Sequence, residues 1–399
     1  MTLRNYYADL HVHIGRTESG NPVKISGSKE LTFHNIAREA SERKGIELIG
    51  IIDCHAPGVQ AEIDHYLDQG QMEELPGGGI RFGRTTILLG SEIEVRDPGT
   101  GPVHLLVYLP DLAAMKSFTA WLRPRMTNVE LSSQRLYATA RELQDEALSR
   151  GGLLVPAHIF TPHKSLYGSG VPRMRQMLDP ERVAAVELGL SADTEMAGTL
   201  SDLDGLTFLT NSDAHSLAKI GREYNRMKLA APTFDEMARA LHRSGGRGVT
   251  ANYGMNPRLG KYHRTYCTAC STLLDDDAIA AARCSCCGSE RIVRGVLDRI
   301  ADLADRAVSF QPSFRPPYRY QVPLEFVPGL GKKKLEQLLD RFGTEMDIIH
   351  RVPEAELRAV AGEAPASVIA GARNGELRFE AGGGGRYGKV TAGKPSTQS

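Results

Sequence analysis

The sequence predicts an α/β fold in which about seven strands alternate with helices and close into a barrel rather than an open sheet. From residue 1 to about residue 252, short apolar runs alternate with stretches of helical periodicity, and the runs tend to end in polar residues. The 399 residues are 41% hydrophobic and 24% charged, which is a globular composition with room for two to three domains. No apolar run approaches the ~18 residues that cross a bilayer, and no secretory signal is recognisable. We therefore expect a cytoplasmic protein with no membrane partner.

The predicted strands are runs of four or more mainly apolar residues. They cover residues 6–11, 47–53, 86–94, 103–109, 152–157, 184–188 and 206–210. Helical periodicity predicts helices at 33–44, 132–150 and 234–244. This alternation is the pattern typical of parallel strands joined by helices.

Three further segments follow the predicted barrel, which we expect to span residues 1–250. Residues 245–265 are basic, free of acids and contain two tyrosines, which fits a linker or an edge that faces nucleic acid. A cysteine-rich module is expected within 251–310, including a helix near 295–308. A helical domain is expected at 311–390, and residues 391–399 should form a disordered tail.

The charge balance excludes a uniformly basic nucleic-acid binder. Lys and Arg total 48 and so do Asp and Glu, giving a formal net charge of zero. The residues up to 240 are nevertheless net acidic, whereas residues 241–399 are net basic. An acidic first part suits cations, and a basic second part suits phosphates.

Histidines and acids recur at the carboxyl ends of the predicted strands, where a parallel α/β barrel places its active site. The set comprises Asp9, His11, His13, Asp53, His55, Glu92, His104, His158, Asp213 and His215. A single histidine is more often a satisfied core or surface residue. As a set, the imidazoles and carboxylates favour a divalent-metal centre of zinc, manganese or iron, and offer too few oxygens for calcium. His163 is a candidate substrate contact in the loop after His158.

Six motifs carry a resemblance to a known family. They are Asp-Leu-His-Val-His at 9–13, Ile-Asp-Cys-His at 52–55, Ser-Glu-Ile-Glu-Val at 91–95, His104, Pro-Ala-His at 156–158 and Asn-Ser-Asp-Ala-His at 211–215. This order resembles the polymerase and histidinol phosphatase (PHP) family. The resemblance implies a distorted (β/α)7 PHP barrel with up to three Zn, Mn, Fe or Mg ions that hydrolyses phosphate esters.

The resemblance also implies a ligand set. One metal would be held by His11, His13, Glu92 and Asp213, a second by Glu92, His104 and His158, and a third by His55 and His215. Asp9 and Asp53 would orient ligands or join the coordination, so that Asp9, Asp53 and Asp213 count as catalytic. Arg16 and Glu18 stand where a further His or Asp ligand is often found, which leaves the third set open.

The cysteines predict a structural zinc site. Cys267 and Cys270 form one C-x2-C pair, Cys284 and Cys287 form another after 13 residues, and Cys286 is an extra thiol. Doubled pairs of this kind are a specific signal for a zinc ribbon with four thiolates. The alternative is free buried or redox-active cysteines.

Two glycine-rich segments are candidates for phosphate binding. Gly329 and Gly331 precede an amphipathic helix that starts with Lys332, Lys333 and Lys334, a pattern that resembles a helix-hairpin-helix motif gripping the DNA backbone. The alternative is an ordinary helix start with solvated lysines. The second segment, residues 382–389, is either a phosphate loop or a flexible linker.

The combination of barrel, ribbon and hairpin resembles the endonuclease Q family of DNA-repair nucleases as far as about residue 390. Further matches are at 158–162, 165–168, 189–193 and 315–318. The resemblance implies cleavage on the 5′ side of uracil, hypoxanthine, xanthine or an abasic site, leaving a 3′-hydroxyl and a 5′-phosphate. DNA with such lesions would be the partner, and a sliding clamp is a second candidate partner that the sequence does not decide.

A lesion pocket is hypothesised between barrel and ribbon, where basic and aromatic residues mix. Its candidate residues are Asn252, Tyr253, Asn256, Lys261 and Tyr262. Interdomain packing is the alternative for the tyrosines. Two other functions stay open, a PHP phosphatase acting on a small phosphomonoester and a non-catalytic DNA-binding scaffold.

Overall fold

The computed structural model describes residues 2–260, 262–380 and 389–391. Lys261, residues 382–388 of the second glycine-rich segment and residues 392–399 of the expected tail lie outside this part. Within it, no helix is long and apolar enough to cross a membrane.

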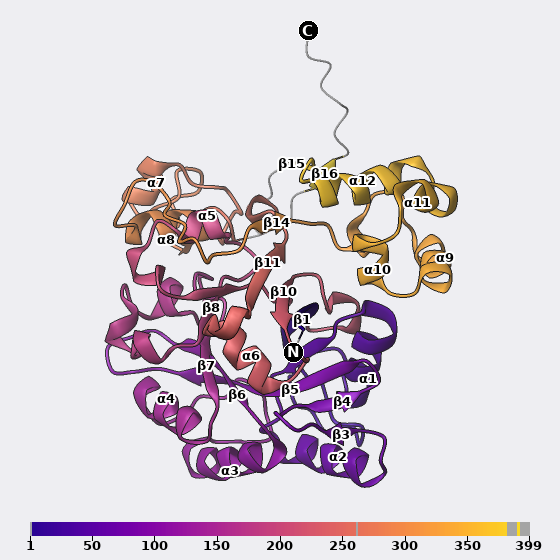
Figure 1. Cartoon of the computed structure of the whole chain (residues 1–399). Helices are drawn as coiled ribbons and strands as arrows, with labels where there is room; N and C mark the ends of the chain where they lie inside the picture. Colours follow the sequence, from indigo (N-terminus) through magenta and orange to yellow (C-terminus); the bar gives the residue numbers. More distant parts are fainter. Residues whose placement is uncertain (1, 261, 381–388, 392–399) are drawn as a thin grey trace.

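A ten-stranded sheet forms most of the barrel (Figure 1). Its main path runs β14-β11-β10-β1-β2-β5-β4-β3, and β6 pairs with both β5 and β7. The strands are β1 Arg4–Val12, β2 Leu48–Ile51, β3 Glu73–Glu74, β4 Ile80–Phe82, β5 Thr85–Val95, β6 Val103–Leu109, β7 Leu153–Pro156, β10 Tyr224–Leu229, β11 Gly248–Gly254 and β14 Tyr318–Tyr320.

A separate parallel pair, β8 Ala185–Glu187 and β9 Thr207–Leu209, closes the ring. On one side the Ala184 amide donates to the Leu154 carbonyl at 3.2 Å. On the other side the side-chain amide of Asn252 donates through Nδ2 to the Phe208 carbonyl at 3.0 Å. The expected α/β barrel is thus confirmed, and all seven predicted strands are present, with bounds shifted by no more than two residues.

The alternation of strands and helices predicted parallel strands, but several strand pairs of the sheet are not parallel. The pairs β5–β6, β6–β7, β1–β10 and β10–β11 are antiparallel. Strand β10 was not predicted because Arg226 and Lys228 interrupt its apolar pattern. Strand β11 occupies the start of the segment expected to be a linker, and it is a sheet strand with a mostly buried pattern.

Helices cover the outside of the barrel. They are α1 Phe33–Arg38, which continues as a π-helix at Glu39–Lys44, α2 Pro57–Asp68, α3 Leu112–Leu122, α4 Ala140–Ser149 and α6 Phe234–Leu241. The helix predicted at 132–150 begins only at Ala140, because Thr139 and Glu142 form a capping box. The residues before it form a loop that reaches the site described below.

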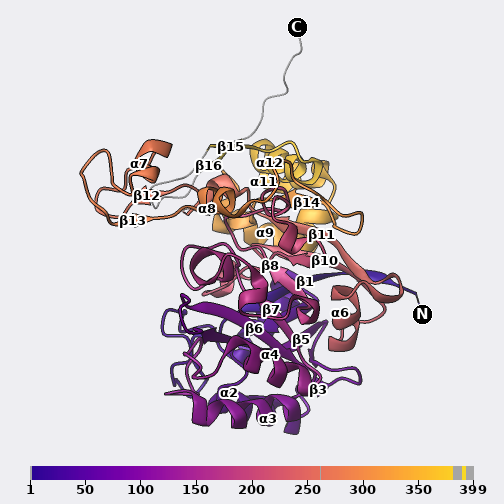
Figure 2. The same cartoon turned by 90° about the vertical axis from the view of Figure 1, so that its left-hand side faces the viewer.

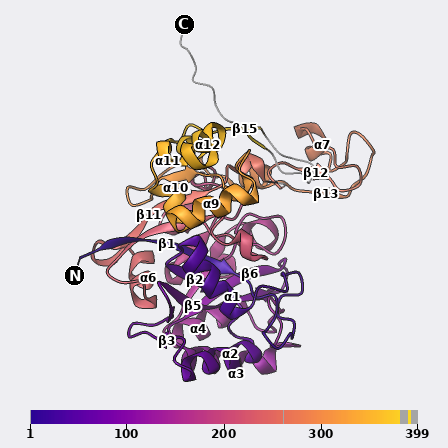
Figure 3. The same ribbon diagram turned by 90° about the vertical axis from the view of Figure 1, so that its right-hand side faces the viewer.

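Two smaller parts lie together on one side of the barrel, opposite α2 and α3 (Figures 2 and 3). The cysteine ribbon contains β12 Tyr266–Cys267, α7 Asp276–Ala280 and β13 Ile292–Val293, and α8 Val296–Leu303 follows it. The helical unit contains α9 Lys332–Phe342, α10 Glu345–His350, α11 Glu354–Ala361 and α12 Glu363–Asn374. The domain boundary expected at 311 is crossed, because β14 pairs with β11 of the barrel.

Candidate metal centre

The first group of ligand atoms comes from β1 and the residue directly after it, from β5 and from the loop after β9. His11 and His13 are two residues apart in an extended segment, so both rings point to the same side. The Nε2 atoms of His11 and His13 lie 3.6 Å from Glu92 Oε1 and Oε2, respectively. Both Nε2 atoms also lie 3.5 Å from Asp213 Oδ1. All four side chains therefore meet, as the resemblance implied for the first metal.

The second group shares Glu92 with the first. His104 Nδ1 lies 2.8 Å and His158 Nε2 lies 3.5 Å from Glu92 Oε1. His104 does not follow a strand end as expected, since it stands near the start of β6. Because β6 runs antiparallel to β5, with His104 paired to Glu94, its first residues reach the same end of the barrel.

The third group differs from the implied set. His215 is brought together with His13 and Asp213, whereas His55 belongs to none of the groups found in the described residues. His55 is buried, and its Nε2 lies 3.4 Å from the Leu131 carbonyl. The described structure thus places His55 and His215 in no common group, and their pairing at a third metal stays a prediction.

The donor set fits divalent cations. In each group the candidate ligand atoms lie within 4.8 Å of one another. His11 Nε2 is buried without a hydrogen-bond partner in the described structure. Burial alone would raise the pKa of Glu92, but His104 and Lys24 hold it well below its ordinary value. Asp213 and His158 adopt left-handed backbone conformations, with φ of 45° and 29°. Such strain concentrates at functional sites.

Two buried carboxylates orient the histidines from behind. Asp53 Oδ2 lies 3.0 Å from His13 Nδ1 and accepts the Ile14 amide at 2.7 Å. Burial alone would raise the pKa of Asp53, yet His13 lowers it to about 2. Glu187 Oε2 lies 2.9 Å from His11 Nδ1, and its Oε1 accepts the His158 amide at 3.1 Å. The sequence reasoning missed Glu187, although it stands at the end of a predicted strand.

Asp9 holds backbone rather than a ligand atom. Its Oδ1 accepts the Ser212 amide at 3.0 Å and its Oδ2 accepts the Gly221 amide at 2.8 Å. These bonds fix the loop that carries Asp213.

Lys24 is a cation of the site that the sequence analysis did not identify, because it lies in a loop without a recognisable motif. Its Nζ donates to Glu92 Oε2 at 3.2 Å and to Ser133 Oγ at 2.6 Å.

A cavity of about 430 Å³ opens beside these ligands. Its wall includes His158, Asp213, His215, Ser191, Lys219, Arg222, Met255 and Tyr262. Tyr262, one of the predicted pocket residues, lines this cavity, and the His163 ring packs edge-on against it at 5.9 Å. Sequence reasoning missed the two cations of the wall.

The other pocket candidates lie elsewhere. Tyr253 is 7% exposed and stacks on Tyr224 at 4.9 Å, which is the packing alternative. Asn252 is buried and joins β11 to β9, so neither side chain reaches the cavity. Asn256 caps a turn by accepting the Arg258 amide at 3.0 Å. The burial of Tyr253 favours the packing alternative, and its assignment as a DNA contact stays a prediction.

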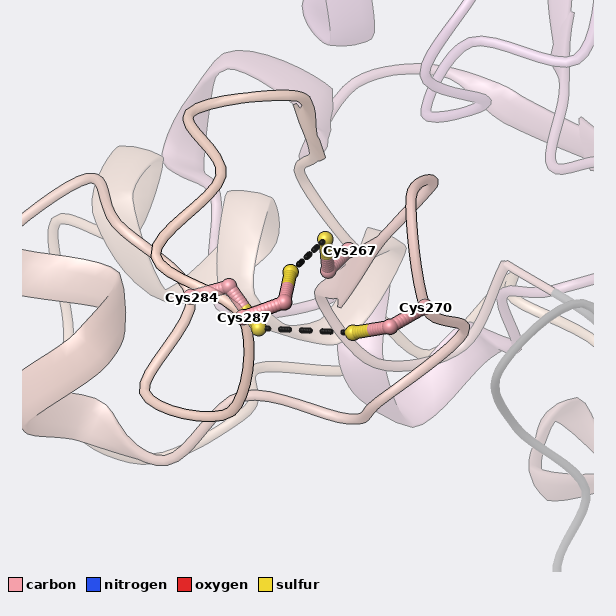
Figure 4. Close-up of side chains that lie close together, drawn as sticks. All are labelled: Cys267, Cys270, Cys284 and Cys287. Atoms are coloured by element: carbon pink, nitrogen blue, oxygen red, sulfur yellow. Dashed lines mark hydrogen bonds between the residues drawn. The ribbon is translucent and has the colours of Figure 1, made fainter.

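The four cysteine thiols of the two pairs converge in the ribbon (Figure 4). The Sγ atoms of Cys267 and Cys287 are 3.7 Å apart, and those of Cys270 and Cys284 are 3.6 Å apart. Tetrahedral zinc with Zn–S bonds of about 2.3 Å requires S–S separations of ~3.8 Å. This geometry fits one zinc ion, and Cys286 lies outside the group.

The glycine hairpin precedes α9 as expected. Gly329 has a φ of 79°, which favours glycine, and Gly331 stands at the amino-terminal cap of the helix. The side chains of Lys332 and Lys333 are exposed. Lys334 differs, because its ammonium group donates to the Ala361 carbonyl at 2.8 Å.

Comparisons with known proteins agree with this geometry. A family model described as "PHP-associated" matches residues 193–244. The uncharacterized protein YqxK of Bacillus subtilis is 50% identical over 391 residues, covering 97% of this chain and 100% of that protein. The crystal structure of the lesion-specific endonuclease PfuEndoQ from Pyrococcus furiosus superimposes with a TM-score of 0.84 at 32% identity, over 97% of this chain and 95% of that one. A complex of endonuclease Q with a 27-mer duplex that places an abasic lesion at the active site gives 0.83 and 32%, over 98% and 97%.

Proposed function

Because the chain belongs to the endonuclease Q family of PHP-domain proteins, we propose that it is a metal-dependent DNA-repair endonuclease. We propose further that it cleaves the phosphodiester on the 5′ side of uracil, hypoxanthine, xanthine or an abasic site and leaves a 3′-hydroxyl and a 5′-phosphate. The observation that carries this proposal is the cavity of about 430 Å³ whose wall includes the candidate metal ligands His158, Asp213 and His215.

The residues of the candidate centre have three roles, which are metal binding, orientation of the ligands and neutralisation of phosphate charge. His11, His13, Glu92, His104, His158, Asp213 and His215 would hold the divalent ions. Such ions activate water and stabilise charge on a phosphoryl group. Glu187 and Asp53 keep His11 and His13, respectively, in the orientation that presents Nε2. Lys24 is placed to neutralise phosphate oxygens next to Glu92.

The cavity supports the extrusion of a nucleotide. Its volume falls in the range of about 300–1,000 Å³ that is usual for small-molecule sites. A deaminated base pairs poorly, so unstacking it costs less than unstacking a normal base. Lys219 and Arg222 would hold the flanking phosphate, and Tyr262 offers an aromatic face for the base.

The helical unit and the ribbon would hold the rest of the duplex. Gly329, Gly331, Lys332 and Lys333 form a hairpin that suits the phosphate backbone without reading bases. Lys334 and Lys261 were expected to contribute, and Lys334 is the weaker candidate since Ala361 already accepts its hydrogen bond. A structural zinc ion in the ribbon, a sliding-clamp partner and a cytoplasmic location stay predictions.

A nicking assay tests the proposal. Duplexes labelled at the 5′ end carry one uracil, hypoxanthine, xanthine, abasic site or no lesion, and are incubated with manganese or with a chelator. We expect one metal-dependent product, ending in a 3′-hydroxyl directly 5′ to the lesion. Phosphate release from a small ester without nicking would support a phosphatase, and a gel shift without cleavage would support a scaffold.

A further inference from the structure

A second cavity lies at the opposite ends of two barrel strands. It has a volume of about 220 Å³ and is lined by the first residues of β9 and β11, by the turn after α6 and by residues 314–316. The metal ligand Asp213 follows the carboxyl end of β9, whereas this cavity adjoins Thr207 at its amino end. The two cavities share no lining residue.

Arg315 is a buried cation in this wall. It is 9% exposed, and its guanidinium stacks on Phe208 at 3.6 Å. Nη2 donates to the carbonyls of Leu203 at 2.8 Å and Leu206 at 3.1 Å. Nε and Nη1 have no hydrogen-bond partner in the described part of the chain. Burying a guanidinium with donors left unmade is costly unless an anion compensates it.

Arg243 places a second positive charge beside the first. Its guanidinium lies over Phe314 at 4.0 Å, and Nη1 donates to Thr207 Oγ1 at 2.7 Å. Nη2 donates to the Gly205 carbonyl at 3.0 Å. Among the described residues, neither Arg243 nor Arg315 forms an ion pair with a carboxylate.

The acids of this region are already paired with other arginines. Glu236 Oε2 lies 2.7 Å from Arg247 Nε, and Asp204 Oδ2 lies 2.7 Å from Arg306 Nη2. Arg247 also lines the cavity, and Gly246, Gly248, Val249, Thr250 and Pro316 add no charged side chain to its wall. Two of the three arginines that line the cavity, Arg243 and Arg315, therefore form no ion pair with a carboxylate in the described part of the chain.

We propose that this cavity binds a phosphate-type oxyanion. Guanidinium groups present planar, parallel donors that match phosphate oxygens, and charge-assisted bonds of this kind are the stronger class. The volume accommodates inorganic phosphate or pyrophosphate, or a single backbone phosphate of DNA. The site is separate from the metal centre, and lesion cleavage does not require it.

The test is the thermal stability of the full-length, metal-loaded protein in phosphate or pyrophosphate, compared with chloride at equal ionic strength. Because phosphate also binds metal ions, the phosphate-dependent rise in Tm is compared between the wild type and its variants. In Arg243→Gln we expect at least half of the phosphate-dependent rise in Tm to be lost, with lesion nicking unchanged. The matched control, Arg141→Gln on the exposed face of α4, should keep the full rise.

Two further arms make the result decisive. Arg315→Lys keeps a positive charge but removes the planar guanidinium group. If this variant folds, we expect it to lose as much of the phosphate-dependent rise in Tm as Arg243→Gln does. A lesion-free duplex added to the wild type separates the two sources, since a rise that depends on Arg243 with DNA alone assigns the site to the DNA backbone. An equal rise in wild type and Arg243→Gln for every anion would overturn the proposal.

Discussion

At the scale of single residues, Glu187 is the least conspicuous member of the candidate centre. It accepts bonds from His11, Asn211 and the His158 backbone, so it connects two ligand groups. We expect Glu187→Gln to raise the manganese concentration for half-maximal nicking by about 10–100-fold, the usual effect of losing such a partner. Metal titrations of the nicking rate would measure this. The exposed Glu195→Gln on α5 (Thr194–Ala197) is the control, and an unchanged metal requirement in Glu187→Gln would contradict the role.

Asp213 is a candidate metal ligand with a left-handed backbone, φ 45°. Asparagine tolerates that conformation, so Asp213→Asn removes the charge with little change in folding. We expect cleavage to fall by more than about 100-fold, while affinity for lesion DNA changes little because the basic residues remain. Single-turnover nicking and gel-shift titration on the same substrate would show both. Cleavage at the wild-type rate would remove Asp213 from the centre.

Glu223 is a buried acid outside the candidate centre. Its Oε1 accepts the Met255 amide at 2.8 Å, and burial raises its pKa to about 8. The unfolded chain loses this proton near pH 4.5 and the folded chain keeps it to about pH 8, so the contribution to stability is full below pH 4.5 and is lost as pH rises to 8. Each unit of pKa difference corresponds to ~1.4 kcal/mol. Glu223→Gln should therefore raise Tm relative to wild type at pH 8 but not at pH 4.5, and equal differences at both pH values would contradict this.

At the scale of elements, the ribbon has little core of its own. Its buried cluster consists of Cys267, Leu274, Ala278 and Cys284. Small units of this kind fold when four thiolates close on zinc. We expect Cys284→Ser to increase hydrogen exchange across 266–293 while strands β5 and β6 stay protected. Cys286→Ser, outside the thiol group, is the matched control, and equal protection of the ribbon in all three proteins would exclude a structural metal.

Elements with strong local signals were predictable from the sequence. The seven apolar runs gave strands close to their observed bounds, and the paired cysteines converge as their spacing indicated. The failures share one cause, which is dependence on contacts distant in sequence. Strand β10 is held by its neighbours β1 and β11, and His215 is grouped with His13 and Asp213 through the fold, which no local pattern reveals.

At the scale of the whole molecule, the helical unit is fixed against the barrel. His350 of α10 stacks on Tyr7 of β1 at 4.7 Å and lies 2.6 Å from the Tyr224 hydroxyl of β10. Lys44 and Glu345 form a second link at 2.9 Å, and one apolar core continues from the barrel into α9–α12. Burial lowers the pKa of His350 to about 3, so the ring is neutral and the stack is undisturbed near neutral pH. The hairpin is thereby held at a set position relative to the cavity.

A fixed hairpin should bind DNA phosphates at a constant distance from the lesion. Each neutralised phosphate contributes about 0.9 to the slope of log affinity against log salt. We expect the double variant Lys332→Gln, Lys333→Gln to weaken binding and to lower that slope by up to about 2, with the nicking rate at saturating DNA unchanged. Lys334→Gln is the internal control, because Ala361 already accepts the bond of that ammonium group and its loss should change the slope less. Fluorescence anisotropy of a lesion duplex between 50 and 200 mM salt measures the slope. Over this range the affinity of a protein with ~6–10 phosphate contacts falls by orders of magnitude. If all three proteins gave the same slope, the hairpin would have no part in DNA binding, and the barrel, the ribbon and the cavity cations would have to account for it.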